Sequence, residues 1–294
     1  MKRNKLPKVS VIIPTYKRPI TLIRCLKSIF KSKYEDFEVI VVNDDPETDL
    51  RTLLKEFNVR IIQHKRNLYA AKSRNDGAKV AKGKLLFFVD DDNILDKNAM
   101  NHLVLNYLKT KNIGLIGPIM YNSFGDLWFY GGKITWITPN LKPLPKTVLK
   151  QKLIETDMIP NAYLISKKLY FKIGCQNSSL PISEDLDFAQ RLKIAGYKNY
   201  VCTKAKTIHD IGKTNTNLID RPPVRMYATV MCNFLMEKKY APKLKFLMFL
   251  LVFVPVHMLL YLFYYIPFKA KNKREYYKAY FRGLKSGIIK IINT

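Results

Sequence analysis

Residues 85–92 read LLFFVDDD, and this stretch decides the fold class. Five apolar residues in a row predict a strand that is buried on both faces, because a strand with one exposed face alternates apolar and polar side chains. The three carboxylates that follow, Asp90, Asp91 and Asp92, repel one another unless a cation neutralises them. Oxygen ligands with no cysteine beside them favour Mg²⁺ or Mn²⁺. A solvated acidic turn is the alternative, but the buried strand before it favours the metal site.

Toward the N-terminus, β-rich runs alternate with runs of helical spacing. The expected strands lie at 9–13, 37–42 and 59–62, and the expected helices at 21–30, 50–57 and 70–81. This order predicts an α/β fold with a mostly parallel central sheet flanked by helices. Ligands of such sheets bind beyond the carboxyl ends of the strands. This rule selects the acids at 90–92 together with Thr15–Tyr16 and Asn43–Asp44–Asp45.

Toward the C-terminus, the pattern changes after residue 96. Glycine, proline and aromatic residues in 113–140 predict antiparallel strands and loops. A helix is expected at 184–195, followed by strands near 198–202 and 205–209. Ser183 can cap that helix, and the carboxylates of Glu184 and Asp185 suit either its first turn or the role of a general base. His209, taken alone, is interpreted as a structural residue.

The formal charge of the chain is +28 at pH 7, an excess that indicates a polyanionic partner. Nucleic acid, an anionic membrane and a phosphorylated substrate all fit. The chain shows no zinc-finger spacing and no aromatic-rich RNA-binding signature, so we expect no nucleic acid among its partners. The four cysteines lie far apart, which argues against a zinc site and a secreted disulfide framework. No export signal is expected, because Pro14 and Lys17 interrupt the first apolar run.

Five segments follow one another in order across about residues 8–215: VSVIIPTYKR (9–18), EVIVVNDDP (38–46), RNLYAAKSRNDGAKVAKGKLLFFVDDD (66–92), SEDLDFAQRLKIAGY (183–197) and HDIG (209–212). Together they resemble the family 2 glycosyltransferases with the GT-A fold. Within that family, the chain looks like the membrane-associated rhamnosyltransferases or the polyprenyl-phosphate-sugar synthases.

The resemblance implies a role for individual residues. The positions similar to the donor-binding residues of the family are Pro14, Thr15, Tyr16, Arg18, Asp44, Arg74, Asp90 and Asp91. Asp92 and His209 match positions that hold a Mg²⁺ or Mn²⁺ ion with the donor diphosphate, which changes the interpretation of His209. Asp185 matches the catalytic base. Glu184, Arg221 and Arg225 are weaker candidates for contacts with the acceptor or the diphosphate.

Three departures from the family pattern put the donor in doubt more than the reaction class. Asn43-Asp44-Asp45-Pro46 replaces the usual Asp-Asp-Gly-Ser, and Asn161 stands where a glycine is usual. No QxxRW motif is present, which disfavours processive polymer synthesis. Two alternatives stay open: a sugar nucleotidyltransferase, whose Gly-rich loop is replaced here by PTYKR, and a basic membrane-surface scaffold without catalysis.

The longest apolar run extends from 244 to 268. As a helix it would measure about 38 Å, enough to span a bilayer. A single span would leave the basic tail outside, against the positive-inside tendency, so we expect a kinked re-entrant hairpin near Pro255. The tail at 275–292 has an apolar and a basic helical face, which favours a helix on an anionic leaflet. A helix packed on the protein is the alternative.

The sequence thus predicts two regions: a GT-A catalytic domain at 1–235, with its donor half at about 1–95 and its acceptor half at about 96–235, and a membrane-associating region at 236–294. The resemblance implies an inverting transferase with a cytoplasmic catalytic domain. It would move a sugar from a nucleotide-diphosphate sugar to a membrane-associated acceptor, either a lipid-linked saccharide or a polyprenyl phosphate.

Overall fold

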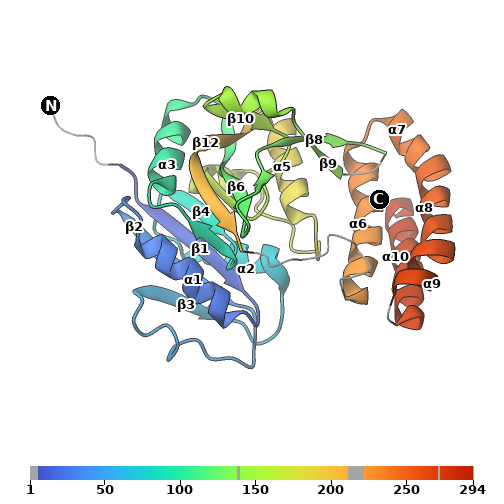
Figure 1. Cartoon of the computed structure of the whole chain (residues 1–294), viewed down its shortest axis with the longest axis horizontal. Helices are drawn as coiled ribbons and strands as arrows, with labels where there is room; N and C mark the ends of the chain where they lie inside the picture. The colour runs from blue at the N-terminus through green and yellow to red at the C-terminus, as the bar shows by residue number, and fades with distance from the viewer. Residues whose placement is uncertain (1–5, 138–139, 211–221, 271, 294) are drawn as a thin grey trace. The chain divides into compact units, whose positions relative to one another are not determined.

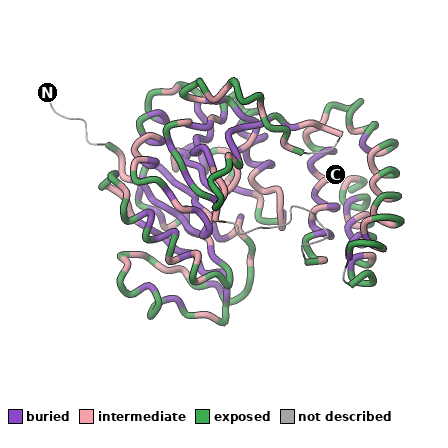
Figure 2. The backbone as a smooth tube through the Cα atoms, in the orientation of Figure 1, coloured by how far each residue is buried: buried purple, intermediate pink, exposed green. Residues whose placement is uncertain are grey.

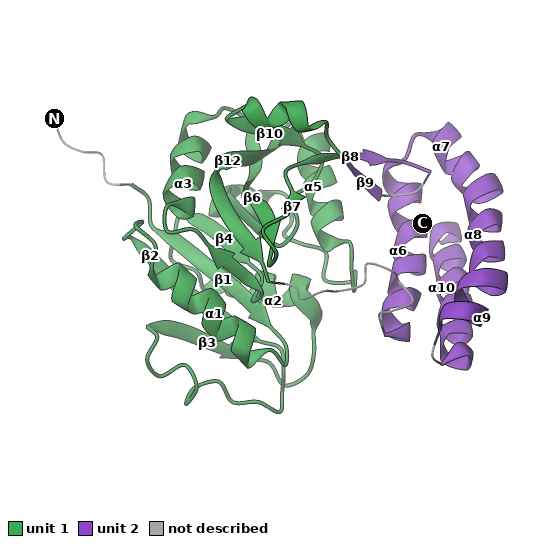
Figure 3. Ribbon diagram, in the orientation of Figure 1, with its two compact units in different colours: residues 1–133, 143–212 green, residues 134–142, 213–294 purple. Residues whose placement is uncertain are grey.

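The computed structural model describes residues 6–137, 140–210, 222–270 and 272–293. The chain forms two compact units, coloured separately in Figure 3. Unit 1 comprises Met1–Lys133 and Pro143–Gly212, and unit 2 comprises Ile134–Lys142 and Lys213–Thr294. The predicted boundary near residue 235 separates a catalytic region from a membrane-associating region, which is a different division from that into compact units. It stays a prediction.

Unit 1 is built on one large sheet whose strands follow the order β10-β12-β6-β11-β4-β1-β2-β3, with β5 paired to β12 and β7 to β6 (Figure 1). The strands are β1 (Val9–Thr15), β2 (Phe37–Asn43), β3 (Val59–Gln63), β4 (Leu85–Val89), β5 (Asn93–Leu95), β6 (Ile113–Asn122), β7 (Leu127–Phe129), β10 (Leu153–Thr156), β11 (Ala162–Ser166) and β12 (Lys198–His209). A short hairpin of β8 (Gly132–Thr135) and β9 (Asn140–Pro143) forms a second sheet.

The half of the sheet formed by the first four strands is parallel, as predicted. β1 pairs with β2 and β4, and β2 pairs with β3. All five residues of β4 are buried, so helices cover both faces of the sheet here (Figure 2). Thr15 lies opposite Asn43 in the register, which brings the carboxyl ends of β1 and β2 to the same edge.

The other half of the sheet is mixed, which differs from the mostly parallel sheet that we expected. β11 runs antiparallel to β4 and β6, while β12 runs parallel to β6. The two strands expected near 198–202 and 205–209 form one strand, β12, with a register shift between Cys202 and Lys206. A periodicity of two residues predicts strands but not their direction, which depends on the connections between them.

The helices of unit 1 are α1 (Pro19–Phe30), α2 (Tyr69–Val80), α3 (Ala99–Lys109), α4 (Lys167–Lys172) and α5 (Glu184–Ile194), with a 3₁₀ helix at Lys146–Lys150. The helix expected at 50–57 is wrong. That segment forms hydrogen-bonded turns, with the Leu54 N–H donating to the Leu50 carbonyl. Leu50 and Leu54 are buried but Leu53 is 40% exposed, and so short a segment gains little stability as a helix by itself.

Unit 2 consists of α6 (Pro223–Tyr240), a long apolar helix at Lys243–Lys269, and α10 (Lys273–Ile292). The long apolar helix contains α7 (Lys243–Met248), α8 (Val254–Leu260) and α9 (Ile266–Lys269), joined by π-helical turns. The three helices share a core in which the rings of Phe234 and Phe249 lie 5.1 Å apart.

The long apolar helix is continuous, so the re-entrant hairpin expected at Pro255 is wrong. Pro255 lies at the start of α8, directly after the π-helical turn Phe249–Phe253. A π-helical turn absorbs the missing N–H of a proline without reversing the chain. By length and composition this helix could cross a membrane, and only 6% of its most apolar window is buried.

The tail forms the predicted helix, α10, but it packs on the protein, which was the alternative interpretation. Its buried residues include Tyr276, Tyr280, Gly283 and Gly287. A Cβ atom on Gly283 would lie 2.9 Å from the Tyr227 carbonyl oxygen of α6. The two glycines therefore allow α10 to approach α6 closely.

Candidate active site

The acidic run after β4 lies at the sheet edge where β1 ends. The Thr15 hydroxyl at the end of β1 donates to Asp91 Oδ2 at 2.7 Å, and both residues are buried. Burial raises the pKa of Asp91 to about 7, against the opposing effects of Arg18 and of the Thr15 hydrogen bond. A carboxyl with this pKa responds strongly to any added positive charge.

Arg18 lies between two of these acids. Its Nη1 is 3.2 Å from Asp91 Oδ1 and 2.6 Å from Asp92 Oδ2. The guanidinium is 54% exposed, while the Asp91 and Asp92 side chains are 5% and 11% exposed. Burial opposes ionisation of Asp92, but His209 and Arg18 together lower its pKa. The arginine therefore supplies a cation that neutralises the acidic run from the solvent side.

Arg74 of α2 joins two motifs that are far apart in the sequence. Its Nη2 donates to Asp90 at 2.6 Å, and its Nη1 donates to Glu184 at 2.9 Å and to Asp185 at 3.2 Å. The guanidinium is only 2% exposed. A buried arginine shared by three carboxylates fixes the start of α5 against the end of β4.

Asp185 is held by Gln176 as well as by Arg74. Gln176 Nε2 donates to Asp185 Oδ1 at 2.8 Å and lies 2.6 Å from the Tyr163 hydroxyl. Burial raises the pKa of Asp185 to about 7; Arg74 opposes this increase, whereas Glu184 and Asp90 add to it. A carboxyl with a pKa near neutrality is suited to accept a proton.

His209 at the end of β12 lies beside Asp92. The distance between its Nε2 and Asp92 Oδ1 is 3.4 Å, and the Asn161 amide nitrogen is 3.0 Å from the same ring nitrogen. The ring of Trp128 packs on the imidazole, with centroids 4.4 Å apart. Asn161 has a φ of 60°, which explains why it occupies a position where glycine is usual.

The two predicted metal ligands, Asp92 and His209, lie close enough together to form part of a metal site. Within the described ranges, no three His, Cys, Asp or Glu side chains converge on one point. Asp92 and His209 can provide two ligands. Mg²⁺ and Mn²⁺ are commonly held by one or two protein ligands together with substrate phosphates, so this donor set fits a metal that binds with its substrate.

Asp44 has a different environment from that expected of a residue facing a ligand. Its carboxylate accepts hydrogen bonds from the backbone N–H groups of Leu68 and Tyr69, and it lies 2.8 Å from His64 Nδ1. Asp44 is 4% exposed. In this structure it organises the loop before α2, and its predicted contact with the donor stays a prediction.

The remaining predicted residues have varied positions. Pro14 is half-buried in β1, whereas the Tyr16 ring is 41% exposed at the sheet edge. Arg225 lies on α6 in unit 2, and Arg221 lies outside the described residues. Ser183 stands before α5, but it has a φ of 65° and its side chain makes no capping hydrogen bond, so the predicted cap is wrong.

A family model described as Glycosyl transferase family 2 matches residues 10–174, which is more than half of the chain. This chain belongs to that family. In this family 2 glycosyltransferase, the contacts of Thr15 with Asp91 and of Arg74 with Asp90 lie within the matched segment. Asp185 and His209 lie beyond it.

Curated relatives carry glycosyltransferase names. An "Uncharacterized glycosyltransferase" of Haemophilus influenzae is 28% identical over 190 residues, covering 63% of this chain and 61% of that protein. The poly(ribitol-phosphate) beta-N-acetylglucosaminyltransferase TarP of Staphylococcus aureus is 36% identical over 118 residues, covering 38% of this chain and 36% of TarP. The family 2 chain thus spans less than two thirds of the length of these relatives.

Solved structures show the same fold. GalNAc-T7, crystallised with UDP, GalNAc and Mn²⁺, gives a TM-score of 0.60 at 18% identity and covers 71% of this chain and 44% of that one. Residues 1–349 of S. aureus TarS give a TM-score of 0.59 at 16% identity, with 97% and 82% covered. The GT-A-like fold predicted from the sequence is confirmed.

Sequence reasoning missed three side chains of the site. Gln176 and Tyr163 contact the predicted base, and Trp128 packs on His209. Gln176 stands in a loop between α4 and α5, where no periodicity marks it. Asn161 gave a signal, since it departs from the family pattern, but its hydrogen bond to His209 was not predicted.

Proposed function

We propose that the protein is an inverting glycosyltransferase that uses a nucleotide-diphosphate sugar and a divalent metal ion. The observation that carries this proposal is the Arg74 cluster, in which one buried guanidinium contacts Asp90 and Asp185. It unites the acidic run after β4 with a carboxyl that has a pKa near 7. A direct displacement at the anomeric carbon requires a base close to the place where the diphosphate binds. A carboxylate with this pKa at the edge of the sheet is suited to be that base.

In this reaction the residues of the chain act on the acceptor and the leaving group. Asp185 accepts the proton of the acceptor hydroxyl, whose oxygen bonds to the anomeric carbon as the bond from that carbon to the diphosphate oxygen breaks. The configuration inverts and the nucleoside diphosphate leaves. Arg74 and Gln176 hold Asp185 in position, and both favour its ionised form against the effect of burial.

Asp92 and His209 are the residues that would hold Mg²⁺ or Mn²⁺. When bound, such an ion neutralises negative charge on the diphosphate as it departs. Arg18, at 54% side-chain exposure, is free to contact the diphosphate from the solvent side. Thr15, Tyr16 and Asp44 would contact the nucleoside, on the implication of the family resemblance.

We propose a membrane-associated acceptor, either a lipid-linked saccharide or a polyprenyl phosphate. The support is the long apolar helix, whose exposed side chains include Leu251, Phe263 and Phe268 at 68%, 69% and 78%. Nucleotide sugars are cytosolic, so the catalytic unit would face the cytoplasm. A polymer of polyol phosphate is a second candidate acceptor, favoured by the charge of +28 and by the substrate named for TarP.

A thermal-shift series with nucleotide sugars, with and without Mn²⁺, tests the proposal. We expect one donor to raise the melting temperature in a metal-dependent way. Formation of a nucleotide sugar from a nucleoside triphosphate and a sugar phosphate would instead support a nucleotidyltransferase. Vesicle binding without any donor effect or transfer would support a scaffold.

Asp185→Asn provides the decisive variant. We expect transfer to fall by about 10²- to 10⁴-fold, because the general base is lost, while the donor still raises the melting temperature. Asp49→Asn, which changes an exposed acid on a turn, is the matched control. Persistence of transfer in Asp185→Asn would show that another group is the base.

A further inference from the structure

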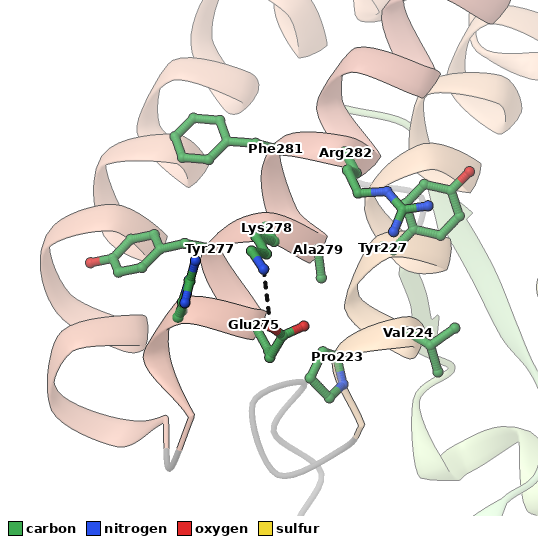
Figure 4. Close-up of a pocket in the computed structure, with 10 residues that line it drawn as sticks. Pro223, Val224, Tyr227, Glu275, Tyr277, Lys278, Ala279, Phe281 and Arg282 are labelled. Atoms are coloured by element: carbon green, nitrogen blue, oxygen red, sulfur yellow. Dashed lines mark hydrogen bonds and ion pairs between the residues drawn. The ribbon is translucent and has the colours of Figure 1, made fainter.

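A wide groove lies between the first turns of α6 and the first half of α10, within unit 2. Its volume is about 1140 Å³, which is large enough for a drug-sized or lipid-sized ligand. Figure 4 shows side chains from both helices lining it: Val224 and Tyr227 come from α6, and Lys278, Phe281 and Arg282 come from α10. We refer to it as the α6–α10 groove.

Three cations stand at regular spacing along this groove. Arg274, Lys278 and Arg282 follow one another at intervals of four residues, which places them on one face of α10. The Arg282 guanidinium lies over the Tyr227 ring, 5.5 Å from its centroid (Figure 4). Lys278 pairs at 3.3 Å with Glu275, the single acid among the described residues that line the groove. The groove therefore carries a net positive charge.

The same groove exposes apolar surface. Val224 is 62% exposed and Phe281 is 50% exposed. Cations beside exposed hydrocarbon match an amphiphile, in which an anionic group adjoins an alkyl chain. A nucleotide would satisfy the cations but leave Val224 and Phe281 in water, and an apolar peptide would leave the cations without partners.

The end of the long apolar helix has the character of a membrane interface. Phe268 and Tyr264 are 78% and 49% exposed, and the Lys269 ammonium lies 5.3 Å from the Tyr264 centroid. Aromatic residues with lysine are typical of the level of lipid headgroups. Only 270–272 separate Lys269 from α10, so Arg274 lies at the same end of unit 2.

We propose that the α6–α10 groove binds the headgroup phosphate of an anionic phospholipid, with the first carbons of its acyl chains against Val224 and Phe281. This proposal rests on the membrane association proposed above and assigns it to a specific site. The alternative is a general attraction of a chain with a charge of +28 to any anionic surface.

Unit 1 offers a matched control for that alternative. A second hollow, of about 400 Å³, is lined by Lys27 of α1, Lys31 directly after α1 and Lys97 in the loop after β5. Removal of these three lysines takes away as many positive charges as removal of the three cations of the groove, but from unit 1. Equal losses of charge can therefore be compared at the two places.

The experiment is flotation of the full chain with vesicles of phosphatidylcholine alone or with added phosphatidylglycerol. We expect wild type to bind the anionic vesicles, and the triple variant Arg274→Gln, Lys278→Gln, Arg282→Gln to lose at least about tenfold in partitioning. The triple variant Lys27→Gln, Lys31→Gln, Lys97→Gln should lose less than about threefold. Arg274→Lys with Arg282→Lys keeps the charges and should bind as wild type does.

Each other outcome contradicts a defined part of the proposal. Equal losses in the two triple variants would show general attraction and overturn the groove. Release by glycerol phosphate, at concentrations that leave ionic strength constant, would indicate a site for free phosphate instead of lipid. Equal binding of wild type to both kinds of vesicle would show that the apolar helix alone is sufficient. Failure of wild type to bind either kind of vesicle would overturn the membrane association itself. It would leave the proposed transfer reaction standing, because donor-dependent transfer is measured in a separate assay. Far-UV circular dichroism and melting temperature establish that each variant is folded.

Discussion

Two arginine side chains determine the charge balance of the acidic run at the sheet edge of unit 1. Arg18 and Arg74 contact different members of the acidic run: Arg18 is half-exposed and contacts Asp91 and Asp92, and Arg74 is buried and contacts Asp90. The two arginines differ in what they are able to do. A buried guanidinium with three carboxylate partners is structural, whereas an exposed one can exchange its partners for those of a ligand.

The pH dependence of transfer should report Asp185. Its pKa is raised to about 7, above the usual range of an aspartate, so the carboxyl is protonated below that pH and becomes an active base above it. Transfer should therefore rise as the pH increases through about 7, measured as kcat/KM against pH. A flat profile between pH 5 and pH 8, about the range in which a group of this pKa titrates, would exclude Asp185 as the base.

Gln176→Leu tests the hydrogen bond that holds the base. The Gln176 amide lowers the pKa of Asp185, so its removal should raise that pKa and move the rising limb to higher pH. Because a hydrogen bond to a charged group is worth about 1.5 kcal/mol, the rate below the limb should fall by about tenfold. A structural defect alone would lower the rate equally at every pH. Ser178→Leu, at an exposed position of the same loop, is the control.

Arg18→Ala tests whether the exposed arginine competes with a metal ion. Removal of its positive charge should tighten Mn²⁺ binding to the donor-free protein by about threefold to fivefold, measured by electron paramagnetic resonance of free Mn²⁺. Affinity for the donor should fall at the same time. Arg51→Ala, which removes an exposed arginine paired with Asp49 at 2.9 Å, is the control. Unchanged Mn²⁺ affinity in Arg18→Ala would contradict the competition.

Helices and strands show how far the sequence was informative. The parallel half of the sheet was predictable, because the apolar run Leu85–Val89 and the largely apolar run Val9–Ile13 mark strands buried on both faces. The direction of β11 and the union of two strands in β12 were not, because they depend on long-range pairing. The acidic run 90–92 was predictable from the position of a strand end, but Gln176, in a loop without periodicity, was not.

The contact between α6 and α10 depends on two small residues. Gly283→Leu should destabilise unit 2 by about 1–3 kcal/mol, because the new side chain would meet the Tyr227 carbonyl and Val230. The expected result is earlier loss of structure in urea, followed by circular dichroism. Lys285→Leu, at an exposed position of the same helix, should change stability little. Equal stability of Gly283→Leu and wild type would show that α10 does not pack in this way.

For the chain as a whole, Arg18 and Arg74 already supply positive charge to the acidic run, so we expect folding not to require a metal ion. Treatment with a chelator should leave the melting temperature within about 2 °C of its value in buffer, in contrast to proteins whose fold requires a structural ion. The same treatment should abolish stabilisation by the donor. A large drop in melting temperature on chelation would indicate that the ion is part of the folded core.

The uncovered flank of the long apolar helix has a practical consequence. In buffer without detergent, the exposed side chains of Leu251, Phe263 and Phe268 can leave water only by contacting the same side chains of another molecule. Recombinant protein made without detergent should therefore self-associate as its concentration rises, whereas a mild surfactant should keep it monodisperse. Purification schemes that discard the particulate fraction would discard the correctly folded protein with it.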